Sequence, residues 1–302
     1  MQFRQTPYNE AMTFTAKIDL KLAPKLMEDL KSQGFEISKA PYAVFSAKKK
    51  GISCTLYESG KLTVQGKEKE PFIEFYLEPE ILQDFRHSHP EAHLNLEPRI
   101  GMDEAGKGDF FGPLCVAAIY ADEVGIKKML QMKVRDSKRI SDEGILKLAA
   151  SLKREFPYTV IRLFPKKYNE LYRKFKNLNR LLAWAHTAAL TDLMQKSGCK
   201  KAILDQFAEK SLMEGMLKQK KIEVDLEQRV RGEEDLVVAS ASILARCAFL
   251  DGLKVLGEEH GVELPKGAAE GVKKVARTLI ARSGPEVLEK VAKIHFKTAG
   301  EL

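Results

Sequence analysis

The stretch Arg99–Tyr120, RIGMDEAGKGDFFGPLCVAAIY, decides how the larger part of this chain folds. Two adjacent carboxylates, Asp103 and Glu104, follow a short apolar run, and a Gly-Pro turn leads into a second apolar run. This pattern predicts a strand, a turn and a second strand, with the bend at the Gly-Lys-Gly segment that follows the acids. Neighbouring strand residues point to opposite faces, so both acids can serve one site only where the strand bends.

The two acids are candidate ligands for a divalent metal ion. Mg²⁺ prefers oxygen ligands and typically takes one or two protein carboxylates together with substrate phosphate. The alternative is a surface hairpin whose acids are solvated, as most charged side chains are. The apolar runs on both sides of the pair favour the metal site, and the glycines next to Lys107 would let the backbone approach a ligand closely.

The same stretch resembles the opening motif of the type 2 and type 3 ribonucleases H. The segment from Asp103 to Pro113 matches that motif without a gap. Lys107 and the Asp-Phe-Phe-Gly-Pro continuation point to ribonuclease HIII, because type 2 enzymes usually carry Arg at that position. Segments 264–267 and 292–297 also resemble ribonuclease HIII, so the resemblance spans nearly the whole chain. It implies an α/β ribonuclease H-like catalytic domain with a mixed central sheet.

Composition is that of a soluble globular protein. The 302 residues are 44% hydrophobic and 30% charged. The sequence has no apolar run of about 18 residues and no apolar signal core near its first residues. We therefore expect a cytoplasmic protein that does not contact membranes. We also expect a monomer, although composition does not decide the oligomeric state. The four cysteines fit neither a zinc spacing nor a disulfide framework.

The pattern divides the chain into three parts, over residues 1–85, 86–98 and 99–302. The resemblance implies that the first is a substrate-binding domain, the second a linker and the third the catalytic domain. The first part reads as strand, helix, three antiparallel strands and a second helix, which predicts an α+β unit with a curved sheet. Ribonuclease HIII has an N-terminal domain similar to half of the TATA-box-binding protein. The linker contains HSHPEAH, whose polar context favours solvated histidines over a metal site.

Charge is unevenly distributed between these parts. Residues 1–95 hold 13 basic and 13 acidic residues, so the net charge of +8 lies entirely in the remainder. A basic excess around acidic residues suits a metal site that binds a polyanion. In the first domain, Lys48, Lys49 and Lys50 are candidate phosphate contacts and Tyr57 is a candidate stacking contact. A solvated basic turn and a packed tyrosine are the alternative.

Further acids lie beyond the opening motif. Asp205 ends a short apolar strand, which is where α/β folds place their ligands. Residues 236–250 predict an apolar helix that is buried nearly all round, with acids just before it. The family resemblance places a fourth acid there. An ungapped match falls on Gly232, a one-residue deletion selects Glu233, and a local shift would select Glu234; we assign Glu233.

A second candidate contact with the substrate precedes the helix that begins near Gly144. Ser141 is its predicted cap, and a helix N-terminus next to basic residues is a ready site for phosphate. Type 2 and type 3 ribonucleases H carry a similar Asp-Ser-Lys segment, so Ser137 and Lys138 resemble the family's phosphate contacts. His186, in another predicted helix, is interpreted as a packing residue rather than a base.

The resemblance implies an endoribonuclease that cuts the RNA strand of RNA–DNA hybrids and leaves 5′-phosphate and 3′-hydroxyl ends. Asp103, Glu104, Asp205 and Glu233 would be the catalytic metal ligands. They would hold Mg²⁺ or Mn²⁺, one ion without substrate and a second ion with it.

In type 2 enzymes the matching Gly-Arg-Gly segment contacts ribose hydroxyls. Gly106, Lys107 and Gly108 are therefore expected to read ribose; alternatively, the glycines only allow the hairpin its positive φ. Other functions also stay open: cleavage beside single ribonucleotides in DNA, a DNA nuclease or recombinase on the same fold, or a non-catalytic protein that binds hybrids. The intact set of acids argues against the last, because a binder would gain affinity by losing negative charge.

Overall fold

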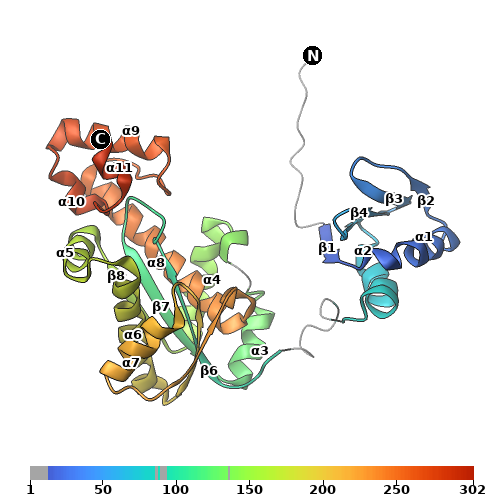
Figure 1. The fold of residues 1–302 in the computed structure, drawn as a ribbon, viewed down its shortest axis with the longest axis horizontal. Coiled ribbons are helices and arrows are strands. Elements are labelled where there is room, and N and C mark those ends of the chain that lie inside the picture. Colours follow the sequence, from blue (N-terminus) through green and yellow to red (C-terminus); the bar gives the residue numbers. More distant parts are fainter. Residues whose placement is uncertain (1–12, 86–87, 89–93, 135–136) are drawn as a thin grey trace. The chain divides into compact units, whose positions relative to one another are not determined.

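The chain folds into two compact units. The computed structural model describes residues 13–85, 88, 94–134 and 137–302. The units are Met1–Asn95 and Leu96–Leu302 (Figure 1). Most of the predicted linker, residues 86–87 and 89–93, lies outside the described residues.

The N-terminal unit is an antiparallel sheet with helices on one face. Its elements are β1 (Thr13–Lys17), α1 (Ala23–Ser32), β2 (Glu36–Ser38), β3 (Ala43–Lys49), β4 (Ile52–Tyr57), β5 (Lys61–Gly66), α2 (Lys69–Phe72) and a π-helical segment, Ile73–Leu82. The strand order is β1-β5-β4-β3-β2. Cys54 and Leu56 of β4 are buried in one core with Leu26 and Leu30 of α1. The expected α+β unit is thereby confirmed.

The second unit is built on a mixed five-stranded sheet. Its first elements are β6 (Arg99–Ala105), β7 (Leu114–Ala121), α3 (Glu123–Gln131), the 3₁₀ turn Ser137–Arg139, α4 (Asp142–Glu155), β8 (Tyr158–Leu163), α5 (Pro165–Phe175) and α6 (Leu178–Ser197). They are followed by β9 (Lys201–Asp205), α7 (Lys210–Gln219), β10 (Asp225–Arg229), the 3₁₀ turn Gly232–Glu234, α8 (Leu236–His260), α9 (Glu270–Ser283), α10 (Val287–Val291) and α11 (Lys297–Gly300). The strand order is β10-β9-β6-β7-β8, with β6, β7 and β8 antiparallel and β10, β9 and β6 parallel. The predicted hairpin and mixed sheet are confirmed.

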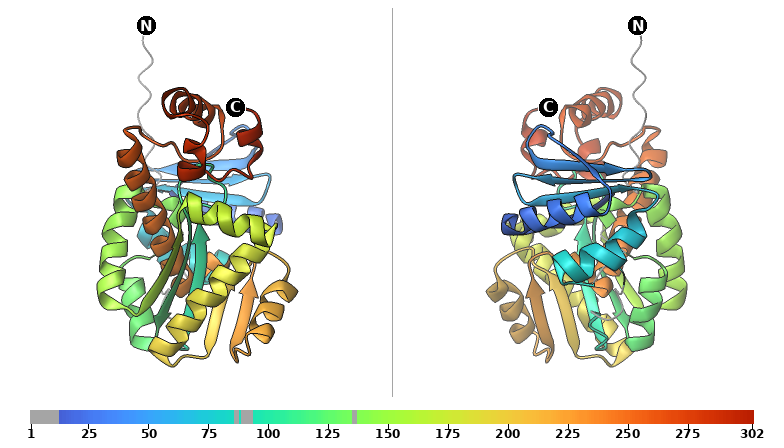
Figure 2. Two further views of the ribbon diagram at one scale, coloured as in Figure 1. Left: turned by 90° about the vertical axis from the view of Figure 1, so that its left-hand side faces the viewer. Right: turned by 90° about the vertical axis from the view of Figure 1, so that its right-hand side faces the viewer.

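Helix α6 covers one face of this sheet and α8 covers the other (Figure 2). Ile100 and Met102 of β6 belong to the same core as Leu182 of α6. Gly101, between them, faces α8: a Cβ there would lie 2.3 Å from the carbonyl carbon of Val237. Glycine at this position therefore allows α8 to pack directly on the backbone of β6.

Helix α8 is longer than the sequence pattern predicts. The apolar run ends near Leu250, but the helix continues to His260. Gly252 does not end it, because this glycine is a packing contact: a Cβ there would lie 2.6 Å from Cγ of Pro113. Length and composition would let α8 cross a membrane, but 78% of its apolar window is buried inside the unit. It is the central core helix.

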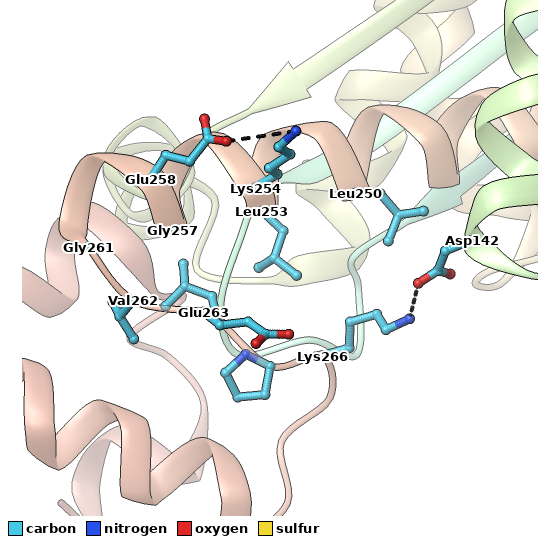
Figure 3. Close-up of a pocket in the computed structure, with 12 residues that line it drawn as sticks. Asp142, Leu250, Leu253, Lys254, Gly257, Glu258, Gly261, Val262, Glu263 and Lys266 are labelled. Atoms are coloured by element: carbon cyan, nitrogen blue, oxygen red, sulfur yellow. Dashed lines mark hydrogen bonds and ion pairs between the residues drawn. The ribbon is translucent and has the colours of Figure 1, made fainter.

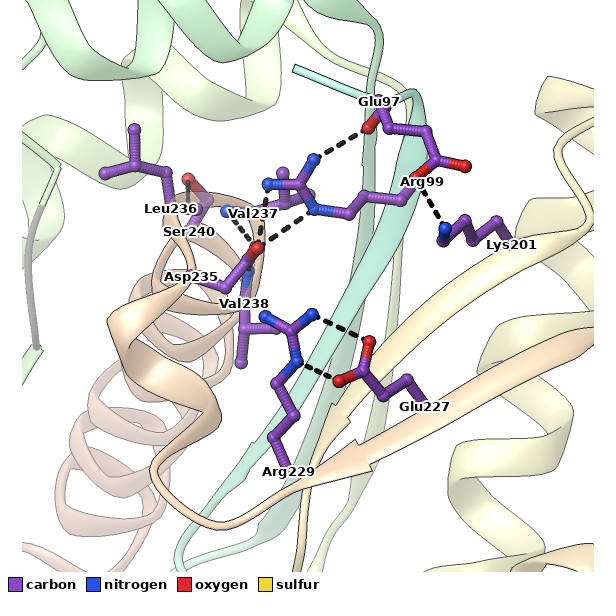
Figure 4. Close-up of polar contacts among 10 residues, drawn as sticks. All are labelled: Glu97, Arg99, Lys201, Glu227, Arg229, Asp235, Leu236, Val237, Val238 and Ser240. Atoms are coloured by element: carbon purple, nitrogen blue, oxygen red, sulfur yellow. Dashed lines mark hydrogen bonds and ion pairs between the residues drawn. The ribbon is translucent and has the colours of Figure 1, made fainter. Parts of the chain in front are cut away.

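A buried ion pair joins the start of α8 to the start of β6 (Figure 4). Arg99 is 1% exposed, and its Nε and Nη2 lie 3.0 and 2.7 Å from Oδ2 of Asp235. The other oxygen of Asp235 accepts hydrogen bonds from the N–H groups of Val237 and Val238, and so caps the helix. One carboxylate thus fixes the position of α8 along β6.

Candidate active site at the ends of β6 and β9

The four predicted acids lie around one cavity of ≈ 460 Å³. Asp103 and Glu104 come from the end of β6, and Asp205 is the last residue of β9. Because β6 and β9 are parallel neighbours, their carboxyl ends meet at the same edge of the sheet. Glu233 reaches the cavity from the 3₁₀ turn before α8. Segments far apart in sequence therefore place carboxylates around one cavity.

Asp103 is buried on the α8 side of the sheet. Its Oδ1 accepts a hydrogen bond from the backbone N–H of Glu104 at 2.7 Å, and Ser242 of α8 supplies a second hydrogen bond. Burial, reinforced by the negative charge of Glu104, raises the pKa of Asp103 to about 7. The carboxyl of Asp103 therefore exchanges its proton near neutrality.

Glu104 faces the opposite side of the sheet, toward α6. Its Oε2 lies 3.1 Å from Nε2 of His186, and its Oε1 lies 3.5 Å from Nζ of Lys107. Burial raises the pKa of Glu104, but the hydrogen bond from His186 and the charge of Lys107 outweigh burial, so the pKa is lowered overall. The two adjacent acids thus have opposite pKa shifts, because Asp103 is buried next to other negative charges and Glu104 lies beside a hydrogen-bonding histidine and a cation.

Asp205 is fixed by the backbone of the turn before α8. Its Oδ1 accepts a hydrogen bond from the N–H of Gly232 at 2.8 Å. A Cβ at Gly232 would lie 2.8 Å from Cα of Asp205, so the glycine allows the turn to pack against the end of β9. Burial, together with the charges of Glu233 and Glu104, raises the pKa of Asp205.

The turn also separates the candidates for the fourth acid. Gly232 is the backbone donor to Asp205 and has no side chain to offer. Glu233 lines the cavity, with its side chain 22% exposed and Oε1 3.7 Å from Nζ of Lys138. Glu234 is 75% exposed and lies 3.9 Å from Arg231. The geometry favours Glu233 as the fourth ligand.

The two glycines of the bend have different structural roles. Gly106 has a φ of +85°, and a Cβ there would lie 2.2 Å from the carbonyl oxygen of Pro113. The fold itself therefore requires glycine at 106. Gly108 does not have a positive φ, and a Cβ at this residue would have no neighbouring atom within 4 Å. Gly108 lines the cavity, and the space where its Cβ would lie is open.

The two predicted phosphate contacts also differ. Ser137 is 4% exposed, and its Oγ lies 2.8 Å from Oγ of Ser242. Its carbonyl oxygen accepts a hydrogen bond from Arg246 at 2.7 Å. Lys138 has a side chain that is 76% exposed at the edge of the cavity. Lys138 is therefore the member of the pair that can meet a phosphate, while Ser137 supports the acids from inside.

Several residues that line or support the cavity are not among those predicted from the sequence. Ser242, Arg246 and Phe249 line it from one face of α8. Their spacing of i, i+4 and i+7 is a signal that the sequence contains, because such residues share a helix face. Lys266 adds a cation from the segment after α8. His186 is more than the packing residue that its sequence context indicates, because it contacts Glu104 directly.

The predicted contacts in the N-terminal unit divide between the two faces of its sheet. Tyr57 lies on the open face, since it alternates with the buried Leu56 in β4. Lys48 pairs with Ser53 in register and shares that open face. Lys49 points the other way, toward α1: its Nζ donates to the carbonyl oxygen of Gln33 at 2.8 Å. Lys50 lies in the turn between β3 and β4.

A second cavity, of ≈ 660 Å³, follows the C-terminal half of α8 (Figure 3). Leu250, Leu253 and Val262 give it apolar walls. Lys266 closes one end and contacts Asp142 at 2.6 Å. None of the four acids lines this cavity, so the smaller cavity is the candidate active site.

The donor set of the smaller cavity fits a hard divalent cation. All four acids offer carboxylate oxygens, the ligands that Mg²⁺ and Mn²⁺ prefer. Among the described residues, no three His, Cys, Asp or Glu side chains are close enough together to form a ready-made cage. Such an open arrangement suits an ion that takes part of its coordination from substrate phosphate.

A mixed sheet with carboxylates at the ends of neighbouring strands, between α6 and α8, defines a nuclease of the ribonuclease H class. The family described as Ribonuclease HII matches residues 100–299. A family described as a domain of unknown function (DUF3378) matches residues 13–89.

Relatives extend the match to nearly the whole chain. Ribonuclease HIII of Protochlamydia amoebophila (strain UWE25) is 50% identical over 285 residues, which are 94% of this chain and 95% of that protein. Ribonuclease HIII of Chlamydia felis (strain Fe/C-56) is 47% identical over 96% of this chain and 97% of its own length. The chain belongs to the ribonuclease HIII family, whose members are endoribonucleases that cleave the RNA strand of RNA–DNA hybrids.

Solved structures agree with this assignment. Bst-RNase HIII in complex with Mn²⁺ matches with a TM-score of 0.68 and 28% identity, over 96% of this chain and 97% of that one. Aquifex aeolicus RNase H3 matches with a TM-score of 0.56 and 28% identity, over 93% of this chain and 99% of that one. The predicted fold class is confirmed for both units.

Metal activation should depend on pH through Asp103. Its pKa is raised from 3.8 to about 7, so below that pH an ion must displace a proton. We expect the Mn²⁺ concentration for half-maximal cleavage to rise as pH falls from about 8 to about 6, approaching tenfold per pH unit below the pKa. Cleavage rates over a grid of pH and Mn²⁺ concentration measure this. A half-saturating concentration that does not change with pH would contradict it.

Proposed function

We propose that this chain cuts the RNA strand of RNA–DNA hybrids at the cavity over β6 and β9. Asp103, Glu104, Asp205 and Glu233 would hold Mg²⁺ or Mn²⁺, one ion in the free protein and a second when substrate is bound. The observation that carries the proposal is the convergence of four carboxylates on one cavity in a chain of the ribonuclease HIII family. The products would have 5′-phosphate and 3′-hydroxyl ends.

Bound divalent ions supply Lewis-acid activation of water and neutralise charge on the departing oxygen. The chain's own contribution begins with electrostatic balance. Lys107, Lys138 and Lys266 line the same cavity as the acids. They attract the phosphate backbone to a site whose carboxylates would otherwise repel it. Asp103 gives up its proton near neutrality, when a cation replaces it.

The alternatives have less support. A type 2-like enzyme would be expected to carry Arg rather than Lys107, and all the relatives named above are type 3 enzymes. A binding protein without activity has no need of a buried Asp103 and a partly buried Asp205 whose pKa values are raised, because burying a charge costs stability. Monomeric state and cytoplasmic location stay predictions from the sequence.

Asp103→Asn tests the site. The amide is nearly the same size but lacks the charge, so metal binding should be lost while the repulsion of phosphate falls. We expect cleavage of a labelled hybrid to drop by at least about 10²-fold, with hybrid affinity unchanged or tighter. Binding can be measured in Ca²⁺ by fluorescence anisotropy. Normal turnover by this variant at any Mg²⁺ or Mn²⁺ concentration would remove Asp103 from the site.

We further propose that the bend at residues 106–108 reads the ribose 2′-hydroxyl, the group that distinguishes RNA from DNA. Support comes from the open space beside Gly108, where backbone groups are accessible at close range. Because its φ is not positive, alanine at 108 fits the fold. The methyl group would occupy the space that a sugar needs.

The variants Gly108→Ala and Gly106→Ala distinguish a role of the bend in ribose recognition from a role in folding. We expect Gly108→Ala to melt like the wild type and to lose at least about tenfold in kcat/KM on hybrid, a loss of ~1.4 kcal/mol. Gly106→Ala should lower the melting temperature, because its Cβ would meet Pro113 and its φ is +85°. Full activity of Gly108→Ala would assign the bend to the fold alone.

The open face of the N-terminal sheet is our proposed second contact with the hybrid. Hydroxyl groups cover this face: Oγ of Ser46 and Oγ1 of Thr55 lie 3.0 Å apart, and Ser53 and Thr63 lie on the same face. Tyr57 adds an aromatic ring. Such a surface can bond 2′-hydroxyls and stack on sugars without strong charge.

Lys48 and Lys49 offer a matched pair for this proposal. They are adjacent in β3, but Lys48 lies on the open face and Lys49 bonds to Gln33 on the helix side. We expect Lys48→Ala and Tyr57→Ala to raise KM for hybrid several-fold and to leave kcat unchanged, while Lys49→Ala leaves KM unchanged. Steady-state kinetics at fixed low salt measure both constants. Equal effects of Lys48→Ala and Lys49→Ala would exclude the open face as the contact.

A further inference from the structure

His186 belongs to a cluster that joins three separate parts of the site. The cluster contains Glu104 of β6, Lys107 of the bend, His186 of α6 and Phe207 of the loop after β9. The ring of His186 stacks on Phe207, with centroids 5.0 Å apart and planes 9° from parallel. Lys107 donates to the carbonyl oxygen of Phe207 at 3.4 Å. Both catalytic strands and the bend therefore meet at this histidine.

The hydrogen bonding of His186 determines which of its nitrogens carries the proton. The side chain is 0% exposed, and Nδ1 has no hydrogen-bond partner within the described residues. A proton on Nδ1 would leave a buried N–H unpaired, which costs free energy. Nε2 is therefore the nitrogen whose proton is used: Nε2–H donates to Oε2 of Glu104 at 3.1 Å, and Nδ1 makes no hydrogen bond within the described residues.

Neither packing nor proton transfer accounts for this arrangement. An apolar side chain would fill the core beside Ala185 and Ala189 without burying two polar nitrogens. A general base needs to reach the water or substrate, and His186 is closed off from solvent. The remaining role is to hold Glu104.

We propose that His186 is a positioning residue for metal binding: it engages Oε2 of Glu104 and leaves Oε1 as the oxygen offered to the cation. Oε1 faces Lys107, which the substrate backbone can draw away. Phe207 fixes the plane of the imidazole, and it lies two residues after Asp205. The cluster thus fixes the position of the Glu104 side chain relative to Asp205. This inference rests on the proposed metal-dependent function.

Hydrogen-bond partners of metal ligands typically contribute 10–100-fold in metal affinity. His186→Leu removes the donor, and His186→Gln restores an amide N–H near the position of Nε2. His186→Asn carries the same amide on a side chain one carbon shorter, so its N–H does not reach Glu104. The Gln and Asn variants are matched in polarity and differ in reach. Thr187→Val is the control, because it removes a buried hydroxyl at the next position of α6 that bonds Ala183 of its own helix.

Binding of Mn²⁺ to each full-length variant can be followed by the electron paramagnetic resonance signal of free Mn²⁺, without substrate. The Mn²⁺ concentration for half-maximal hybrid cleavage is a second readout. We expect His186→Leu and His186→Asn to weaken Mn²⁺ binding about 10–100-fold and to shift half-activation equally. Cleavage at saturating Mn²⁺ should change much less. His186→Gln should recover most of the affinity, and Thr187→Val should match the wild type.

Mn²⁺ affinities of His186→Asn and His186→Gln that equal the wild type would assign His186 to packing and overturn the proposal. A loss of affinity that is the same in both variants would also overturn it, because reach would then be irrelevant. If His186→Leu does not fold, the Mn²⁺ affinities of His186→Gln and His186→Asn still test the proposal. Failure of the proposed function has a different signature. Either the wild type itself would not cleave hybrid, or the Asp103→Asn variant would cleave it normally.

Discussion

The contact between α8 and β6 is the constraint on which the rest of the catalytic unit depends. Arg99 and Asp235 pair at its start, both almost fully buried, and Gly101 lets the helix rest on the strand backbone. Breaking such a pair by removing one partner typically costs about 3–5 kcal/mol. Its larger consequence is geometric. Once the start of α8 is joined to the start of β6, Asp103 is placed opposite Ser242. The same face of α8 then supplies Arg246.

Electrostatics explain why each acid of the site has a hydrogen-bond donor or a cation beside it. Four carboxylates around one cavity repel one another, and burial adds to the cost of their charge. The chain offsets this cost with single hydrogen bonds from Ser242 to Asp103, from His186 to Glu104 and from Gly232 to Asp205. The hydroxyl of Ser242 and the backbone N–H of Gly232 stabilise charge without neutralising it. Lys107 and Lys138, at 3.5 Å from Glu104 and 3.7 Å from Glu233, add positive charge that a bound cation would replace.

The sequence predicts those parts of the site that are contiguous. The motif after Arg99 specifies a hairpin, because its strand, glycine and turn signals all lie within one short segment. The fourth acid is harder to assign, because the choice between Glu233 and Glu234 depends on the turn that Gly232 makes against Asp205. His186 shows the same limit. A buried histidine in an apolar helix has the same sequence pattern whether it meets a leucine or a carboxylate, and only the packing of α6 on β6 decides.

In the N-terminal unit, the run of three lysines shows a related limit of predicting contacts from composition. Three consecutive lysines suggest one basic patch, but alternation along β3 sends Lys48 and Lys49 to opposite faces, and the turn takes Lys50. Strand periodicity therefore carries more information about contacts than local charge does. The same rule applied to β4 correctly separates Tyr57 from Leu56.

The C-terminal segment completes the bend that precedes β7. Lys293 is fully buried, and its Nζ donates to the carbonyl oxygens of Asp109, Phe111 and Gly112 at 2.8, 3.3 and 2.7 Å. Burial lowers the pKa of this ammonium to about 7. Three acceptors match its three N–H groups, so the loop after the bend has a fixed path. Asp109 is also bonded to the N–H of Gly267 at 2.6 Å. The loop that directly follows the segment proposed to read ribose is thus shaped by residues far away in sequence, and a rigid backbone is what discrimination by a single hydroxyl requires.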